Sequence, residues 1–300
     1  MRILLCTLAG LGLLTAAPSS AQAAVNVFAC EPEWAALASE LGGENLEIYT
    51  ASNANQDVHH MRAKPSLLAA MRRADLVICS GASLEVGWLP ILLNKAGSPS
   101  VQYGEMGSIM AADYVELLGI MQDVDRSMGH VHPEGNPHMH LDPRNIALIA
   151  DVITERLTAL DAEKSALYTA KLKTFQNQWA ASMRRWDDQA SDLKGKKVVV
   201  YHKSWVYLLN WLGMHDVVSL EPKPGIPPTA SHLEKVLHDI EGEDILGIFV
   251  APFENGRAAK WLADKSGLPI LALPFTVGGN KQVVDLTRLF DETLNILKGQ

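Results

Sequence analysis

VNVFACEPEWAALASEL, residues Val25–Leu41, places a short apolar run directly before a stretch with helical spacing. Val25–Ala29 has the length and continuous apolar character of a buried strand, and Glu31–Leu41 carries apolar residues three and four positions apart. The same alternation recurs along the chain. Short apolar strands that alternate with amphipathic helices are typical of parallel βαβ units. The sequence therefore predicts an α/β fold of two lobes, each a parallel sheet flanked by helices.

We predict an N-terminal α/β lobe over residues 24–160, which includes a histidine-rich loop at 129–140. After the opening strand and helix, the remaining elements follow from apolar runs of strand length and from three- and four-residue spacing. The expected strands are Asn45–Thr50, Asp75–Ser80 and Ser100–Tyr103, and the expected helices are Lys64–Ala74, Leu84–Asn94 and Arg144–Leu160.

A long helix is predicted next, over the linking segment 161–193 and from about Ala162 to Leu193. About 30 residues would extend about 45 Å, too long for the interior of one small domain, so we interpret it as a strut between lobes. Two shorter helices with a kink remain an alternative. The C-terminal α/β lobe, 194–300, has expected strands Lys197–Tyr201, Val217–Leu220, Leu246–Val250 and Ile270–Leu273, and helices Trp205–Leu212, Ala230–Glu241, Arg257–Lys265 and Val283–Leu297.

Residues 1–23 have the pattern of a secretory signal peptide. Arg2 precedes an apolar run from Ile3 to Leu14, and Ala21-Gln22-Ala23 fits the small-residue cleavage rule, so the mature chain is expected to begin at Ala24. The apolar run is shorter than the roughly 20 residues of a membrane span. Cys6 lies too early for a lipidated cysteine. We expect a periplasmic protein that is neither lipidated nor embedded in the membrane.

Charge and cysteine content argue against some classes of binding partner and metal site. The formal net charge is −8, and loss of Arg2 with the signal peptide makes it −9, which argues against nucleic acid or anionic membrane partners. Only Cys30 and Cys79 remain in the mature chain. Each ends a predicted strand, so neighbouring strands could bring them together in an oxidising compartment, and the sequence leaves their pairing open. Two thiols without a CxxC motif do not indicate a cysteine-based zinc site.

The segment GHVHPEGNPHMHLD, Gly129–Asp142, contains four histidines. Imidazole is a common ligand of late first-row metals, so the segment indicates metal binding, although a solvated loop is the plain alternative. His59 and His202 each follow a predicted strand, and ligands of α/β sheets bind beyond the carboxyl ends of strands. Three imidazoles would suit a zinc-type ion and not calcium or magnesium. The remaining histidines, His215, His232 and His238, are interpreted as surface or hydrogen-bonded residues.

Three motifs carry a resemblance to a known family. They are His59 with Pro65-Ser66, Ala74-Asp75 and Gly81-Ala82-Ser83-Leu84-Glu85; Pro137-His138-Met139-His140-Leu141-Asp142-Pro143; and Tyr201-His202. The chain resembles the cluster A-I metal-binding subunits of bacterial ABC importers for zinc and manganese, over essentially its whole mature length. In the second motif, His140 replaces the tryptophan of the family pattern.

The resemblance implies that His59, His138 and His202 are metal ligands. His60 and His140 then become neighbours that support these ligands or substitute for one of them. The family also has an acidic fourth ligand after the last strand of the second lobe, but Leu273–Gly279 here contains no carboxylate. Asp285 and Glu254 are weak candidates for the position. Water or a histidine is the alternative, and the fourth ligand stays open.

A nitrogen-rich site without a carboxylate favours Zn²⁺ over Mn²⁺. The resemblance implies a monomeric, non-enzymatic protein that captures zinc between its lobes and delivers it to the membrane permease of an ABC importer. It also implies that His130 and His132, beside Glu134, gather metal for the site or sense its abundance. A periplasmic zinc metallochaperone and a three-histidine zinc hydrolase are the alternatives. No HExxH motif or P-loop is present in the sequence.

Overall fold

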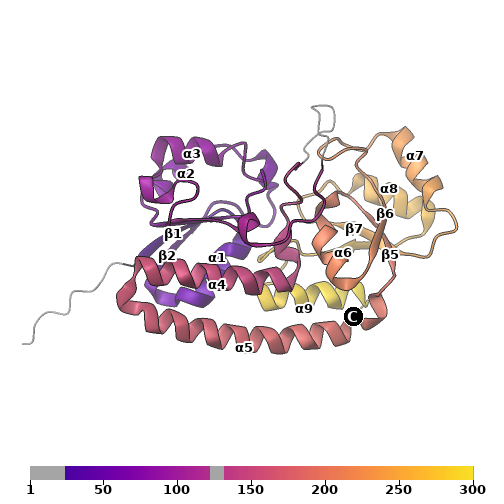
Figure 1. Ribbon diagram of the computed structural model, residues 1–300. Coiled ribbons are helices and arrows are strands. Elements are labelled where there is room, and N and C mark those ends of the chain that lie inside the picture. Colours follow the sequence, from indigo (N-terminus) through magenta and orange to yellow (C-terminus); the bar gives the residue numbers. More distant parts are fainter. Residues whose placement is uncertain (1–23, 122–131, 300) are drawn as a thin grey trace, which may run out of the picture.

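The computed structural model describes residues 24–121 and 132–299, which form two parallel sheets flanked by helices. Figure 1 shows the two lobes side by side, with one long helix, α5, running beneath both. The predicted α/β class is confirmed. The signal peptide predicted at residues 1–23 lies outside the described residues.

The N-terminal sheet has the strand order β2-β1-β3-β4, and its strands are all parallel. Every residue of β3 is buried, as expected for a central strand covered by helices on both faces. The strands are β1 Val25–Ala29, β2 Leu46–Thr50, β3 Leu76–Cys79 and β4 Ser108–Met110, and the helices of this lobe are α1 Pro32–Gly42, α2 Pro65–Met71 and α3 Leu89–Ala96.

The C-terminal sheet repeats this arrangement with the order β6-β5-β7-β8, again all parallel. In both sheets the first strand in sequence is central, and its carboxyl end faces the space between the lobes. The strands are β5 Lys197–Val200, β6 His215–Ser219, β7 Ile245–Val250 and β8 Ile270–Ala272, and the helices are α6 Val206–Leu212, α7 Ala230–Asp239, α8 Arg257–Ser266 and α9 Leu286–Leu297.

Two helices connect the lobes, α4 Pro143–Leu160 and α5 Ser165–Gln189. The 25 residues of α5 span about 37 Å, which agrees with the predicted strut. A single buried apolar core includes Ile78 of β3, Trp179 of α5 and Val200 of β5. The lobes are therefore joined by continuous apolar packing as well as by the chain itself.

The largest differences from the expected elements are found in three places. The strand predicted at Ser100–Tyr103 is wrong: Pro99–Val101 is a 3₁₀ helix, and β4 is the edge strand. The helix predicted from Leu84 begins only at Leu89, because residues 82–88 form turns and Trp88, directly before the helix, has a non-helical φ of −143°. The long helix is shorter than predicted, because its two ends, Ala162–Lys164 and Ser191–Leu193, are 3₁₀ turns.

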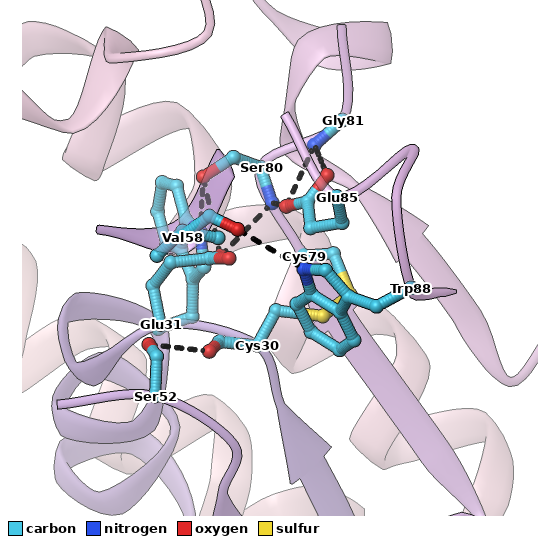
Figure 2. Close-up of a disulfide and its surroundings, with 10 residues drawn as sticks. Cys30, Glu31, Ser52, Val58, Cys79, Ser80, Gly81, Glu85 and Trp88 are labelled. Carbon is cyan, nitrogen blue, oxygen red and sulfur yellow. Dashed lines mark hydrogen bonds between the residues drawn. A yellow bond between two sulfur atoms is a disulfide. The ribbon is translucent and has the colours of Figure 1, made fainter. Parts of the chain in front are cut away.

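Cys30 and Cys79 form a disulfide between neighbouring strands β1 and β3, with their Cα atoms 4.8 Å apart. Figure 2 shows the bond in the interior of the lobe, close to the buried carboxyl groups of Glu31 and Glu85. Both carboxyl groups accept a hydrogen bond from the backbone N–H of Ser80. The pairing left open by the sequence is thus present, at the carboxyl ends of two central strands.

Over the described residues, no helix combines the length and apolar character needed to cross a membrane. Strand and helix burial instead follow the pattern of a helix-covered parallel sheet.

Candidate metal centre

Three histidines from distant parts of the sequence meet in the cleft between the lobes. His59 lies in a short 3₁₀ helix, Val58–His60, in the segment that follows β2. His138 immediately precedes the 3₁₀ helix Met139–Leu141, and His202 comes two residues after β5. One nitrogen atom from each ring lies within 4.8 Å of the other two. Ligand atoms this close can converge on a single ion.

Carboxylates hold two of the rings. The Nδ1 atom of His59 is 2.8 Å from Asp57 Oδ1, and that of His202 is 2.7 Å from Glu221 Oε2. Because a carboxylate only accepts, each Nδ1 carries the proton and each Nε2 keeps its lone pair. Carboxylate–histidine pairs of this kind orient metal ligands and raise their basicity. Burial raises the pKa of Asp57, but the hydrogen bonds that it accepts from the side chain and the backbone N–H of His59 outweigh burial and hold that pKa below its ordinary value.

His138 is buried, with 4% of its surface exposed. Neither ring nitrogen has a hydrogen-bond partner among the described residues. Burial lowers the pKa of His138 well below its usual value, and the neighbouring imidazoles lower it further. A buried, neutral imidazole with no protein partner is the form that binds a metal ion.

Asn136 fixes the position of His138. Its Oδ1 accepts from the backbone N–H of His138 at 3.0 Å, and its Nδ2 donates to the carbonyl of Lys203 at 2.7 Å. Lys203 follows His202, so one side chain ties two of the three histidine segments together. Sequence analysis missed Asn136, Asp57 and Glu221. The position of Asp57, two residues before His59, was the one available signal.

His140 is directed away from the three rings. Its Nε2 is 3.0 Å from the carbonyl oxygen of Phe275, and its Nδ1 is 3.1 Å from Glu33 Oε1. The Glu33 carboxylate also accepts a hydrogen bond from Thr276 of the other lobe. His140 therefore joins the lobes through a buried polar link. His60 is 58% exposed and lies 3.5 Å from Asp57, outside the converging set.

Phe275 occupies the segment where the family resemblance implies an acidic ligand. Its ring lies edge-on to His138 and His140, with centroid separations of 5.1 and 5.2 Å. Asp285 caps α9, where it accepts from the N–H of Arg288, and is not among the residues that line the cleft. The structure thus does not bring Asp285 to the candidate site.

Glu254 does line the cleft. Its Oε2 accepts from the N–H of Ala251 at 2.7 Å, while Oε1 is buried without a partner among the described residues. Burial raises the pKa of Glu254 to about 8, with a further contribution from Glu221, so this carboxyl is largely protonated at neutral pH. It does not belong to the converging set of ligand atoms.

Besides His138 and His140, one further histidine of the histidine-rich loop, His132, is among the described residues. The Nε2 of His132 lies 3.0 Å from His59 Nε2. His130 lies outside the described residues.

His215 is exposed on β6, His232 hydrogen-bonds to the carbonyl of Ser219, and His238 is 83% exposed. These three lie away from the site, as predicted.

Two α/β lobes joined by a long helix, with imidazoles gathered in the cleft between them, define a metal-binding substrate-binding protein of an ABC importer. The family model for ZnuA, described as zinc-uptake complex component A periplasmic, matches residues 27–298, and the chain belongs to this family.

Relatives with known names include proteins for two metals. The manganese ABC transporter substrate-binding lipoprotein PsaA of Streptococcus pneumoniae is 20% identical over 245 residues, covering 80% of this chain and 76% of PsaA. The high-affinity zinc uptake system protein ZnuA of Brucella abortus is 26% identical over 127 residues, covering 42% of this chain and 38% of that protein.

Solved structures share the fold. A crystal structure of ZnuA superposes with a TM-score of 0.75 at 18% identity, covering 92% of this chain and 98% of the other. A manganese-bound periplasmic metal-binding protein from Candidatus Liberibacter asiaticus gives 0.74 at 17% identity, with 92% and 99% covered. At these identities the likeness establishes the fold alone.

Proposed function

We propose that this protein captures Zn²⁺ between its two lobes and delivers it to the permease of an ABC importer. The observation that carries the proposal is His138, a buried imidazole whose two nitrogens have no partner among the described residues, with one ring nitrogen each of His59 and His202 within 4.8 Å. An ion bound by the three rings would satisfy a buried polar group that otherwise costs free energy. Binding and release need no chemical step, so the proposed role is not enzymatic.

The choice of zinc over manganese rests on the donor set. Imidazole suits Zn²⁺, whereas Mn²⁺ prefers carboxylate and carbonyl oxygen. The three converging ligand atoms are nitrogens, and Phe275 lies where the resemblance implies a carboxylate. Because named relatives include both zinc and manganese proteins, the relatives alone do not decide the metal.

The cellular setting is part of the proposal. The signal-peptide pattern of residues 1–23 supports export, and the position of Cys6 supports a chain without a lipid anchor, unlike the lipoprotein relatives. We propose a monomer in the periplasm, divided into lobes at 24–160 and 194–300 with the linker 161–193. The shared core supports small lobe movements rather than wide hinge closure, so release requires local rearrangement at the cleft.

Titration of the apo-protein with Zn²⁺ tests the proposal. We expect one tight site, and His59→Ala, His138→Ala and His202→Ala should each weaken it strongly. His238→Ala removes an exposed imidazole and serves as the matched control. The affinity for Zn²⁺ should decrease as the pH is lowered below about 6.5, because ordinary imidazoles become protonated there. Loss of affinity only when both His130 and His132 are removed would overturn the proposed site.

Competition between metals tests the zinc assignment. At equal free concentrations, Zn²⁺ should displace Mn²⁺ from the wild-type protein. Tighter binding of Mn²⁺ would replace zinc with manganese in the proposal while leaving the three-histidine site in place.

A further inference from the structure

His132 and His59 are 73 positions apart in the sequence, and their imidazole rings contact each other. Their Nε2 atoms are 3.0 Å apart, and their ring centroids are separated by 5.1 Å. His132 is the first described residue of the histidine-rich loop, whereas His59 follows β2 of the N-terminal sheet. The loop therefore brings a fourth imidazole next to His59, at the edge of the three rings whose nitrogens lie within 4.8 Å of one another.

The hydrogen bonds on the far side of each ring determine where the protons lie. His132 Nδ1 is 2.9 Å from the carbonyl oxygen of Ala82, and His59 Nδ1 is 2.8 Å from Asp57 Oδ1. Carbonyl and carboxylate oxygens only accept hydrogen bonds, so both Nδ1 atoms carry protons. In the neutral rings, both Nε2 atoms then present lone pairs to each other.

Two lone pairs at 3.0 Å require a positive charge between or beside them. A proton can supply it if one ring becomes an imidazolium, and a metal ion can supply it without changing either tautomer. On a tetrahedral zinc ion with Zn–N bonds of about 2.0–2.1 Å, two nitrogens lie about 3.3 Å apart. The observed separation is close to that value.

The ring of His132 is held by the N-terminal lobe. Ala82 belongs to the turn after β3 that has positive φ angles, and the hydroxyl of neighbouring Ser83 donates to Glu134 Oε2 at 3.4 Å. Two contacts thus attach the end of the histidine-rich loop to this turn. A backbone carbonyl fixing the tautomer of a metal-binding histidine is a common outer contact of metal sites.

We infer that His132 is the fourth ligand, so that four imidazoles and no carboxylate surround the metal. This inference rests on the proposed function and completes its site. A site of four nitrogens favours late first-row ions over Mn²⁺, which prefers oxygen. His59, His138 and His202 are held by segments beside the two sheets, and His132 is held by its contact to the carbonyl oxygen of Ala82.

The test compares wild-type apo-protein with His132→Ala and with His238→Ala as a matched control. His132→Ala should still bind one zinc ion. Its zinc affinity should fall by at least the roughly 10- to 100-fold that loss of an outer partner causes. His238→Ala should bind as the wild type does. His132→Asp should recover part of the zinc affinity and bind Mn²⁺ more tightly than the wild type, because it returns a fourth donor as oxygen.

Visible absorption of the Co²⁺-loaded protein reports coordination directly. The wild type should give the intense bands of a four-coordinate ion, and His132→Ala should give weaker bands as water enters and coordination expands. Unchanged zinc affinity together with an unchanged Co²⁺ spectrum would overturn the inference and assign the 3.0 Å contact to a shared proton. This result differs from the one expected if the proposed function is wrong. In that case His59→Ala, His138→Ala and His202→Ala would bind zinc as the wild type does.

Discussion

The aromatic ring of Phe275 lies edge-on to the imidazole of His138, with ring centroids 5.1 Å apart. Phe275 stands in the segment after β8, where the family resemblance implies an acidic ligand. Both rings are more than nine-tenths buried. An apolar ring here excludes water from one side of the candidate site and offers no oxygen donor, which favours zinc over manganese.

Phe275→Asp should therefore shift metal preference. The new carboxylate would lie next to His138 and supply the hard donor that Mn²⁺ prefers, so the ratio of Mn²⁺ to Zn²⁺ affinity should rise by about tenfold or more, equivalent to about 1.4 kcal/mol. Competition titrations with the two metals measure the ratio. Phe275→Leu is the matched control, since it shortens the side chain without adding oxygen. An equal ratio in both variants would contradict the prediction.

Asp57 and Glu221 should tune metal affinity without being ligands. Each accepts from the Nδ1–H of one histidine, His59 or His202, and so directs the other nitrogen at the ion. Asp57→Asn and Glu221→Gln should each weaken zinc binding by roughly 10- to 100-fold while one zinc still binds. Zinc titration against a competing chelator measures this. Asp285→Asn, at the exposed start of α9, should leave affinity unchanged. A lost binding site in either variant would make that carboxylate a ligand instead.

Part of the candidate site could be predicted from the sequence, because two of its histidines follow predicted strands. His59 and His202 follow strands whose apolar runs are clear in the sequence, and carboxyl ends of parallel strands face a common cleft. The convergence of His138 with them came from the motif resemblance. The contacts of Glu221 and Glu33 could not be predicted, because they join residues 19 and 107 positions from His202 and His140 and depend on side-chain packing.

Local backbone chemistry explains the fold errors. The apolar residues near Ser100 resemble a strand, but Pro99 lacks an N–H for a sheet ladder and begins a 3₁₀ helix. The apolar residues from Leu84 have helical spacing, yet residues 82–88 form turns, and the helix begins only after Trp88, whose φ is −143°. Spacing alone carries no information on such turns.

His140 should matter more for stability than for metal binding. Its Nε2 is hydrogen-bonded to the carbonyl of Phe275, its Nδ1 lies 3.1 Å from Glu33 Oε1, and only 2% of its side chain is exposed. His140→Ala would remove the hydrogen bond to the carbonyl of Phe275 and the imidazole beside the buried Glu33 carboxyl, which should lower the free energy of unfolding by roughly 1–3 kcal/mol. Denaturant unfolding measures the loss. Zinc stoichiometry should remain one, and a folded variant that no longer binds zinc would identify His140 as a ligand.

The buried carboxyl pair beside the disulfide gives a prediction about pH. Glu31 and Glu85 share the N–H of Ser80 as a donor (Figure 2). Burial raises the pKa of Glu31 well above its ordinary value, with Glu85 adding to the effect, and burial raises the pKa of Glu85 to about 7. The folded protein therefore holds protons that the unfolded chain releases near pH 4.5. Under linkage, the Glu85 proton makes the free energy of unfolding fall as pH rises from 4.5 to about 7, and the Glu31 proton acts in the same direction.

Glu85→Gln should remove this part of the pH dependence. The amide cannot ionise, and its NH₂ can donate to the Glu31 carboxylate while its oxygen still accepts from Ser80. At pH 8 the variant should be more stable than the wild type by roughly 1–3 kcal/mol, and below about pH 5 the difference should vanish. Denaturant unfolding across this range measures both stabilities. Glu47→Gln, which changes an exposed carboxylate on β2, should leave the curve unchanged. A variant less stable than the wild type at pH 8 would show that the Glu85 carboxylate, once ionised, is fully compensated by the N–H groups of Ser80 and Gly81.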